Sequence, residues 1–197
     1  EINNTAYNRT RDVLHSVYKN TIQMLKDRGY ENIQACQTNE EIIINMKSNS
    51  HIISGEKDKK ILHVFFSNDE RVGVKQVRLW VESSYADKLI IVSLEGPTSF
   101  TRKEAEINYP HIQFFMYRDL CVNIVRHSLV PKHEKINVDQ YPFKLSESKL
   151  ELPGLYINDK VSQYYDYQLG DLIRITRTCG VSEPIYYYRL VRMPHVM

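Results

Sequence analysis

The chain has 197 residues, of which 42% are hydrophobic and 25% charged, and its formal net charge is +2. This length allows one large domain or two small ones with a buried core, and the composition is ordinary for a soluble globular protein. A charge so close to zero excludes a strong overall attraction to nucleic acid, so DNA binding would need a local basic patch or partner proteins.

Cysteine usage and hydropathy indicate the cellular compartment and the absence of membrane-spanning segments. Cys36, Cys121 and Cys179 are far apart and form no CxxC pair, which indicates a reducing compartment and no disulfide framework or zinc knuckle. The polar N-terminus has no signal-peptide core, and no apolar run is long enough to cross a bilayer. We therefore expect an intracellular protein without membrane contact.

Two helices are predicted near the start of the chain. The first helix should end at Gly29, and its apolar residues recur at helical spacing at Leu14, Tyr18, Ile22 and Leu25. The second should open at Thr38, because Glu41 is placed to complete a capping box with it.

The hydrophobic period then changes to one typical of strands. Residues 61–66 and 111–117 read as strands, and residues 77–82 alternate between apolar and polar positions, as a strand with one buried face would. Residues 88–96 form a continuous apolar run, which favours a central strand covered on both faces.

This order of elements predicts an α+β protein. Residues 1–134 should form an N-terminal α/β domain, with helices packed on a mixed sheet. Residues 135–150 are polar and predict a connector, and residues 151–197 contain short β-type runs separated by turn signals. The last part should therefore be a small, mostly β domain.

The stretch HSLVPKHE, residues 127–134, is the first candidate for chemistry. His127 and His133 are six positions apart with Pro131 between them, so they cannot share a helical face as an HExxH zinc pair does. The sequence also lacks a nucleophile elbow and a phosphate-binding glycine loop. We expect no catalytic residue, no metal site, no cofactor and no small-molecule substrate.

A metal-dependent nuclease is an alternative, since Asp69, Glu82 and Glu95 are predicted at strand ends. None of them is followed two positions later by the lysine that restriction-type nucleases usually carry. Glu147-Ser148-Lys149 has that local form but lies in the predicted connector. Solvated acids at strand ends are the commoner explanation.

Tyrosine-rich runs at residues 163–167 and 185–191 could stack on nucleic-acid bases. Both are predicted here as strand-like, so about half of their side chains must face the core. A core and a protein-interaction surface explain them better than nucleic-acid binding does.

The order of motifs resembles a known family. LVPKHE, residues 129–134, is similar to the hallmark stretch of the DNA-directed RNA polymerase subunit that eukaryotic enzymes share as subunit five and that has a shorter archaeal counterpart. The resemblance covers nearly the whole chain and is carried by residues 23–30, 63–82, 89–104, 152–177 and 187–191. Residues 63–82 are similar to a hairpin of two strands in that family.

The resemblance implies a non-catalytic polymerase subunit with a nuclease-like N-terminal jaw domain and a C-terminal assembly domain, joined near residues 127–134. Its partners would be the largest polymerase subunit, the other polymerase subunits and downstream duplex DNA. Because the archaeal counterparts lack the jaw, a eukaryotic or large-DNA-virus member is implied, found in the nucleus, or in host cytoplasm or virion if virus-encoded. A metal-dependent nuclease and a free-standing DNA-binding module stay open as alternatives.

The resemblance also implies two sets of functional residues. The sequence itself predicts a helix beginning near Thr98 or Thr101, which would either offer backbone amides to phosphates or be a capped helix with solvated surface cations. The resemblance favours DNA contact, and the DNA-proximal residues would be Pro97, Thr98, Ser99, Arg102 and Lys103. The subunit interface would comprise Pro153, Asp159, Val161, Tyr164, Arg177, Tyr188 and Arg189. The chain departs from the family pattern at Lys160, where a proline is usual, at Asp166, where a glycine is usual, and at Gln168, Leu169 and Cys179.

Overall fold

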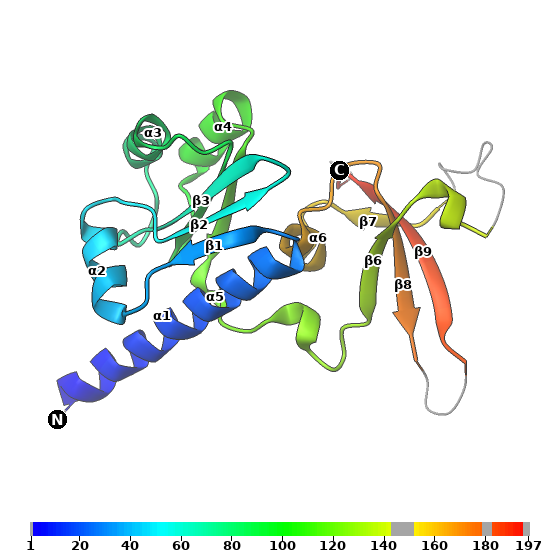
Figure 1. Cartoon of the computed structure of the whole chain (residues 1–197), viewed down its shortest axis with the longest axis horizontal. Coiled ribbons are helices and arrows are strands. Elements are labelled where there is room, and N and C mark those ends of the chain that lie inside the picture. Colours follow the sequence, from blue (N-terminus) through cyan, green and yellow to red (C-terminus); the bar gives the residue numbers. More distant parts are fainter. Residues whose placement is uncertain (1, 143–151, 179–182, 195–197) are drawn as a thin grey trace. The chain divides into compact units, whose positions relative to one another are not determined.

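The computed structural model describes residues 2–142, 152–178 and 183–194 (Figure 1). The chain divides into two compact units, Glu1–Val122 and Asn123–Met197, and each contains its own sheet. Both sheets mix parallel and antiparallel pairs, in agreement with the predicted α+β class. No helix in the described ranges is long and apolar enough to cross a membrane.

The first unit has a five-stranded sheet in the order β1-β2-β3-β4-β5. β1, β2 and β3 pair antiparallel, whereas β3, β4 and β5 pair parallel. The strands are β1 (Glu31–Ala35), β2 (Ile53–Lys57), β3 (Lys60–Phe66), β4 (Lys88–Ser93) and β5 (Ile112–Met116). The helices are α1 (Ile2–Asp27), α2 (Asn39–Lys47), α3 (Val74–Ser83), α4 (Ser99–Asn108) and α5 (Tyr117–Leu120).

Helices cover both faces of this sheet, with α1 on one side and α3 and α4 on the other (Figure 1). Successive residues of a strand point to opposite faces, so Phe65 and Phe66 of β3 serve the two layers. Phe66 meets Tyr18 of α1 with ring centroids 6.5 Å apart, and Phe65 stacks on Trp80 of α3 at 5.4 Å. β4 is buried on both faces from Leu89 to Ser93, as predicted for a central strand.

Several predicted elements are confirmed in this unit. The strands expected at residues 61–66 and 111–117 are β3 and β5, and α1 is followed by Gly29 with a positive φ of 81°. Thr38 caps α2, and Glu41 completes the capping box.

The strand predicted at residues 77–82 is wrong, because these residues belong to helix α3. The buried side chains are Val77 and Trp80, three positions apart on one helical face, whereas Leu79 is 44% exposed. Val77, Leu79 and Val81 alternate as a strand would, but this alternation is a coincidence. The residues that face the core, Val77, Trp80 and Val81, are three and four positions apart, as in a helix. The hairpin is instead β2–β3, turned by Asp58 and Lys59 with φ of 52° and 64°.

The second unit has a four-stranded sheet in the order β6-β8-β9-β7. β6–β8 and β8–β9 pair antiparallel, and β7 pairs parallel with β9. Its core is formed by Leu155, Tyr167, Ile173, Ile175 and Val191. The elements are η1 (Ile124–Arg126), β6 (Lys132–Ile136), η2 (Val138–Gln140), β7 (Gly154–Tyr156), α6 (Lys160–Tyr165), β8 (Leu172–Arg177) and β9 (Ile185–Arg192).

The domain boundary differs from the one predicted at residue 134. β6 pairs along its whole length with β8, from Lys132 opposite Thr176 to Ile136 opposite Leu172, so it belongs to the second sheet. Four of its five residues are polar or charged, which concealed the strand and gave it the composition of a connector. Residues 143–150 of the predicted connector lie outside the described residues, and residues 163–165 of the first tyrosine run are helical rather than strand-like.

Candidate functional site

The loop after β4 lies at the carboxyl edge of the parallel strands, where α3 and α4 also begin. Gly96 has a φ of 80°, and a Cβ added there would meet the side chain of Met116 at 3.3 Å, so this turn requires glycine. The Val72 N–H donates to the Gly96 carbonyl at 3.0 Å, and the Thr98 N–H donates to the Val72 carbonyl at 3.1 Å. These two bonds hold the loop against the segment that precedes α3.

Thr98 is the N-cap of α4. Its hydroxyl accepts from the Thr101 N–H at 3.2 Å and lies 2.8 Å from the Thr101 hydroxyl. The Arg102 N–H is bonded to the Thr98 carbonyl, so within the described chain the amides left open at this helix end are those of Ser99 and Phe100.

The predicted DNA-proximal residues thus divide into two kinds. Ser99, Arg102 and Lys103 are exposed, whereas Pro97 and Thr98 are partly buried and organise the turn. The electrostatic environment is mixed, because the same loops carry the acidic residues Glu70 and Glu95. These two residues are neighbours, since the Glu95 N–H donates to the Glu70 carbonyl at 2.8 Å. Any attraction to phosphate must therefore come from local contacts and not from a broad basic field.

The acids considered for a nuclease are not brought together. Asp69 and Glu95 lie in the loops after β3 and β4, but Glu82 is in the last turn of α3. That turn is about 12 Å along the helix from the edge where α3 begins. Among the residues described, no group of three or more His, Cys, Asp or Glu could hold a metal ion.

In the second unit, two of the predicted interface residues belong to the core. Val161 and Tyr164 are 7% and 3% exposed on helix α6. The Tyr164 hydroxyl accepts from the Asn123 side-chain amide at 3.1 Å. Asp159 is the N-cap of α6 and accepts from the Val161 N–H at 2.9 Å. Val161 and Tyr164 therefore position α6 and have almost no surface to offer a partner.

The other predicted interface residues are at least partly exposed. Arg177 lies over the ring of Tyr187 at 5.2 Å, and Arg189 donates to the Gly154 carbonyl at 3.1 Å. Pro153 is exposed, and its carbonyl accepts from the Leu190 N–H. Tyr188 points to the opposite face of the sheet, where its ring meets Tyr141 edge-on at 4.9 Å.

His133 joins some of these residues into one cluster. Burial lowers its pKa, the charges of Arg189 and Arg177 act in the same direction, and the Pro131 carbonyl and Asp159 oppose them. Its Nδ1 donates to the Pro131 carbonyl at 2.7 Å. His133, Asp159, Arg177 and Arg189 are therefore within electrostatic reach of one another.

The two histidines of residues 127–134 do not form a common site. His127 Nδ1 accepts from the Leu129 N–H at 3.2 Å, a turn contact, whereas His133 on β6 donates to the carbonyl of Pro131, which precedes that strand. Both rings satisfy local backbone groups.

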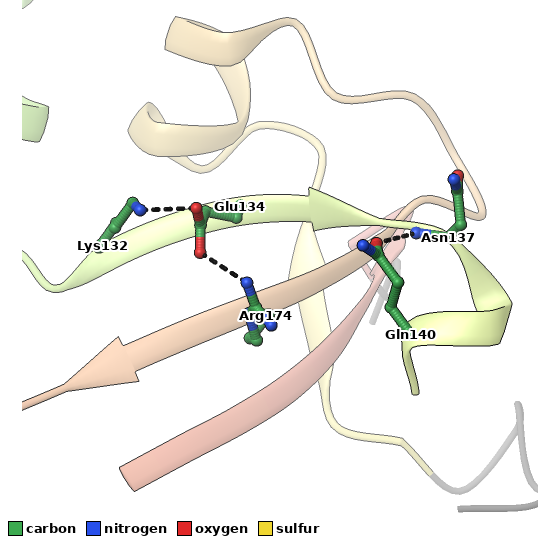
Figure 2. A network of polar contacts seen from close by, with 5 residues as sticks. All are labelled: Lys132, Glu134, Asn137, Gln140 and Arg174. Carbon is green, nitrogen blue, oxygen red and sulfur yellow. Dashed lines mark hydrogen bonds and ion pairs between the residues drawn. The ribbon is translucent and has the colours of Figure 1, made fainter. Parts of the chain in front are cut away.

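Figure 2 shows a polar network on the other face of this sheet. Glu134 of β6 accepts from Lys132 at 2.6 Å and from Arg174 of β8 at 3.1 Å. The hydrogen bond from Lys132, followed by that from Arg174, lowers the pKa of the Glu134 carboxyl. Arg174 also lies over the Tyr186 ring at 5.6 Å, and in η2 the Asn137 N–H donates to the Gln140 side chain at 3.0 Å. Sequence reasoning missed this network because the pairing of Glu134 with Arg174 depends on strand register.

Comparison with known proteins finds a family to which the second unit is similar. Residues 122–191 match the family model described as RNA polymerase Rpb5, C-terminal domain. This segment is therefore similar to the Rpb5 C-terminal domain. Curated relatives extend the similarity over most of the chain, and three of them follow.

The DNA-directed RNA polymerases I, II, and III subunit rpabc1 of Dictyostelium discoideum is 28% identical over 192 residues, covering 90% of this chain and 96% of the relative. The corresponding subunit RPABC1 of Caenorhabditis briggsae is 26% identical, with 90% and 95% covered. The DNA-directed RNA polymerase V subunit 5A of Arabidopsis thaliana is 26% identical, with 88% and 85% covered. The resemblance to subunit five is confirmed, and it supports a polymerase subunit over an independent enzyme.

Two departures from the Rpb5 pattern fall at the ends of α6. Lys160, in place of the usual proline, is the first residue of the helix, where proline is favoured because that N–H needs no helical partner. Asp166, in place of the usual glycine, is the C-cap and has a left-handed φ of 58°. The residue usual in the family suits the backbone conformation at each of these two positions. The departures therefore affect the stability of α6. Gln168 and Leu169 form the exposed turn after it, and Cys179 lies outside the described residues.

Proposed function

We propose that this chain is the non-catalytic fifth subunit of a DNA-directed RNA polymerase. Its C-terminal unit docks on the largest subunit, and its N-terminal unit helps to hold downstream duplex DNA. The observation that carries the proposal is the Rpb5 C-terminal match over residues 122–191, together with relatives named as polymerase subunits over about nine-tenths of the chain. A cellular member would work in the nucleus, and a virus-encoded one in host cytoplasm or virion.

Docking through the second unit is supported by its exposed charged cluster. The charges of Asp159, Arg177 and Arg189 all act on His133; Asp159 and Arg177 are exposed and Arg189 is partly exposed. Pro153 is exposed beside Gly154, whose carbonyl accepts from Arg189. Arginines held in place by neighbouring groups lose little freedom on binding, which favours them as contact residues.

DNA contact through the first unit is supported by the start of α4. The open amides of Ser99 and Phe100, the helix dipole and the exposed cations Arg102 and Lys103 suit a phosphate oxygen. Such contacts would position the duplex without reading its sequence.

The docking is tested by co-purification of the tagged chain from its native source. The large polymerase subunits should accompany it in stoichiometric amount, and their absence would overturn the proposed function. The DNA contact is tested separately in polymerase reconstituted with Arg102→Ala plus Lys103→Ala. The plot of log affinity for downstream duplex against log salt should become shallower by about 0.9 for each phosphate that the variant no longer neutralises.

A matched control removes two charges elsewhere. Lys19 and Lys26 are exposed on α1, and Lys19→Ala plus Lys26→Ala should leave the salt dependence unchanged. If the Arg102/Lys103 variant is incorporated and its slope equals that of the control, the loop does not contact DNA.

A further inference from the structure

The last strand of the second sheet is only partly covered by its neighbours. β8 pairs with β9 from Ile185 to Leu190, but β7 pairs with it only from Leu190 to Arg192. Among the described residues, no strand lies along the β7-side edge of residues 185–189. Figure 1 shows this half of β9 at the margin of the sheet.

The backbone groups that face this open edge can be assigned. The Leu190 N–H donates to Pro153 at 3.1 Å and the Arg192 carbonyl accepts from Ile157 at 2.9 Å, both on the β7 side, whereas Val191 bonds to Asp171 on the other side. Backbone groups alternate along a strand, so the N–H and C=O groups of Tyr186 and Tyr188 face the open edge. Within the described chain these four groups have no backbone partner.

The first four residues of this edge, Ile185–Tyr188, lack the features that prevent strand pairing, and Arg189 at its end is the one charged residue. Its register with β8 is unbroken, so no bulge twists it away, and its residues Ile185-Tyr186-Tyr187-Tyr188 include no charge and no proline. An aromatic edge without a bulge can pair with another extended chain. Such an edge is expected to be covered when the protein is assembled.

The side chains beside the edge are already ordered. Tyr186 and Tyr187 are 50% and 46% exposed and lie on opposite faces, and each ring is held by an arginine of β8. The two arginines differ in their surroundings. Arg174, beside Tyr186, forms an ion pair with Glu134, whereas Arg177, beside Tyr187, is exposed at the end of β8. On the face of Tyr187, a strand laid against this edge would meet two arginines, Arg177 and Arg189, with one acid, Asp159, within electrostatic reach.

We propose that an extended segment of another polymerase subunit adds to the sheet as a fifth strand, pairing with the backbone of Tyr186 and Tyr188. This inference rests on the proposed function. The segment would alternate acidic residues, facing Arg177 and Arg189, with apolar residues facing Tyr186 and Tyr188. Main-chain bonds would supply affinity, and this alternation would supply selectivity.

The test compares two substitutions at one position. Tyr186→Ala and Tyr186→Pro both remove the ring, but only proline removes the outward N–H and blocks the edge, while the bonds to β8 remain. We expect the proline variant to enter the reconstituted polymerase at least tenfold less well than the alanine variant, with similar melting temperatures. Tyr187→Pro removes an N–H that faces β8 and should lower the melting temperature. It is the control for a substitution that disrupts the fold itself.

Equal incorporation of the two Tyr186 variants would overturn the added strand and leave the subunit assignment intact. Failure of the wild-type chain to enter the polymerase would overturn both.

Amide hydrogen exchange tests the same edge without a substitution. In the free chain the amides of Tyr186 and Tyr188 should exchange quickly and those of Tyr187 and Arg189 slowly, and assembly should slow the first pair at least a hundredfold. Protection of Tyr186 and Tyr188 in dilute free chain would mean that the chain covers its own edge. Protection that rises with concentration, together with dimers in sedimentation, would mean that a second copy covers it. Either result would overturn the proposal.

Discussion

Acid should destabilise the first unit through a stacked pair of histidines, of which His63 is buried and His51 partly buried. His63 of β3 is 1% exposed, stacks on His51 with ring centroids 4.0 Å apart, and receives the edge of Tyr85 at 4.6 Å. Its Nδ1 is 2.9 Å from the Ser84 hydroxyl, and its Nε2 is buried with no partner among the described residues. Burial, and then the neighbouring His51, lowers the pKa of His63 from 6.5 to about 4.

The direction of the effect follows from proton linkage. The unfolded chain binds a proton on this ring more readily than the folded chain does, so the folded state loses stability as pH falls below 6.5 and the loss levels off below about 4. With these two values, His63 alone should lower the free energy of unfolding by about 2 kcal/mol at pH 5 and about 3 kcal/mol at pH 4. His51, whose pKa burial also lowers, adds to the same trend.

Urea unfolding of wild type and His63→Phe between pH 7 and pH 4 measures how much His63 contributes to the pH dependence of the free energy of unfolding. Phenylalanine keeps an aromatic ring against His51 but cannot titrate, so the wild type should lose about 2 kcal/mol more than the variant between pH 7 and pH 5. Ser84→Ala leaves His63 titratable and should retain the wild-type pH dependence. A stability difference between wild type and His63→Phe that is constant across this range would refute the reasoning.

Three further predictions concern single positions and activity. Asp166→Gly should raise the free energy of unfolding of the second unit by about 0.5–1 kcal/mol, because glycine adopts the left-handed C-cap of α6 without strain; an unchanged or lower value in thermal unfolding would contradict this. Thr98→Ala should cost about 1 kcal/mol by removing the cap of α4, and Thr98→Ser should restore most of it; equal losses in the two variants would argue against the cap. The purified chain should leave duplex and single-stranded DNA intact with magnesium or manganese, whereas cleavage abolished by Asp69→Ala or Glu82→Ala would support the nuclease alternative.

Local signals were sufficient for much of the first unit. The capping box of Thr38 and Glu41, the turn at Gly29 and the apolar run of β4 each specify their structure within a few residues, and each was predicted. Residues 77–82 failed because an alternating pattern and a helical pattern share Val77 and Val81, and only packing of Trp80 on Phe65 decides between them.

Long-range pairing limited prediction of the second unit and of the candidate sites. β6 is polar, and only its register with β8 reveals that Glu134 is opposite Arg174. The interface residues carried over from the family pattern included Val161 and Tyr164, because a pattern does not distinguish a residue kept for packing from one kept for a partner. The start of α4, by contrast, was predicted near Thr98 or Thr101 from its own sequence, and the N-cap is Thr98.

The strand order of the second sheet has a consequence for how the protein is made. All strands of the first unit are complete by Met116, so that sheet can close while the ribosome is still adding the second unit. β6 leaves the ribosome long before β8, its partner, and β7 pairs with β9 alone, which is the final strand. Premature termination after Ile136 and before Leu172 would therefore release a complete first sheet attached to a β6 without its partner β8. Such a product is suited to aggregation or degradation.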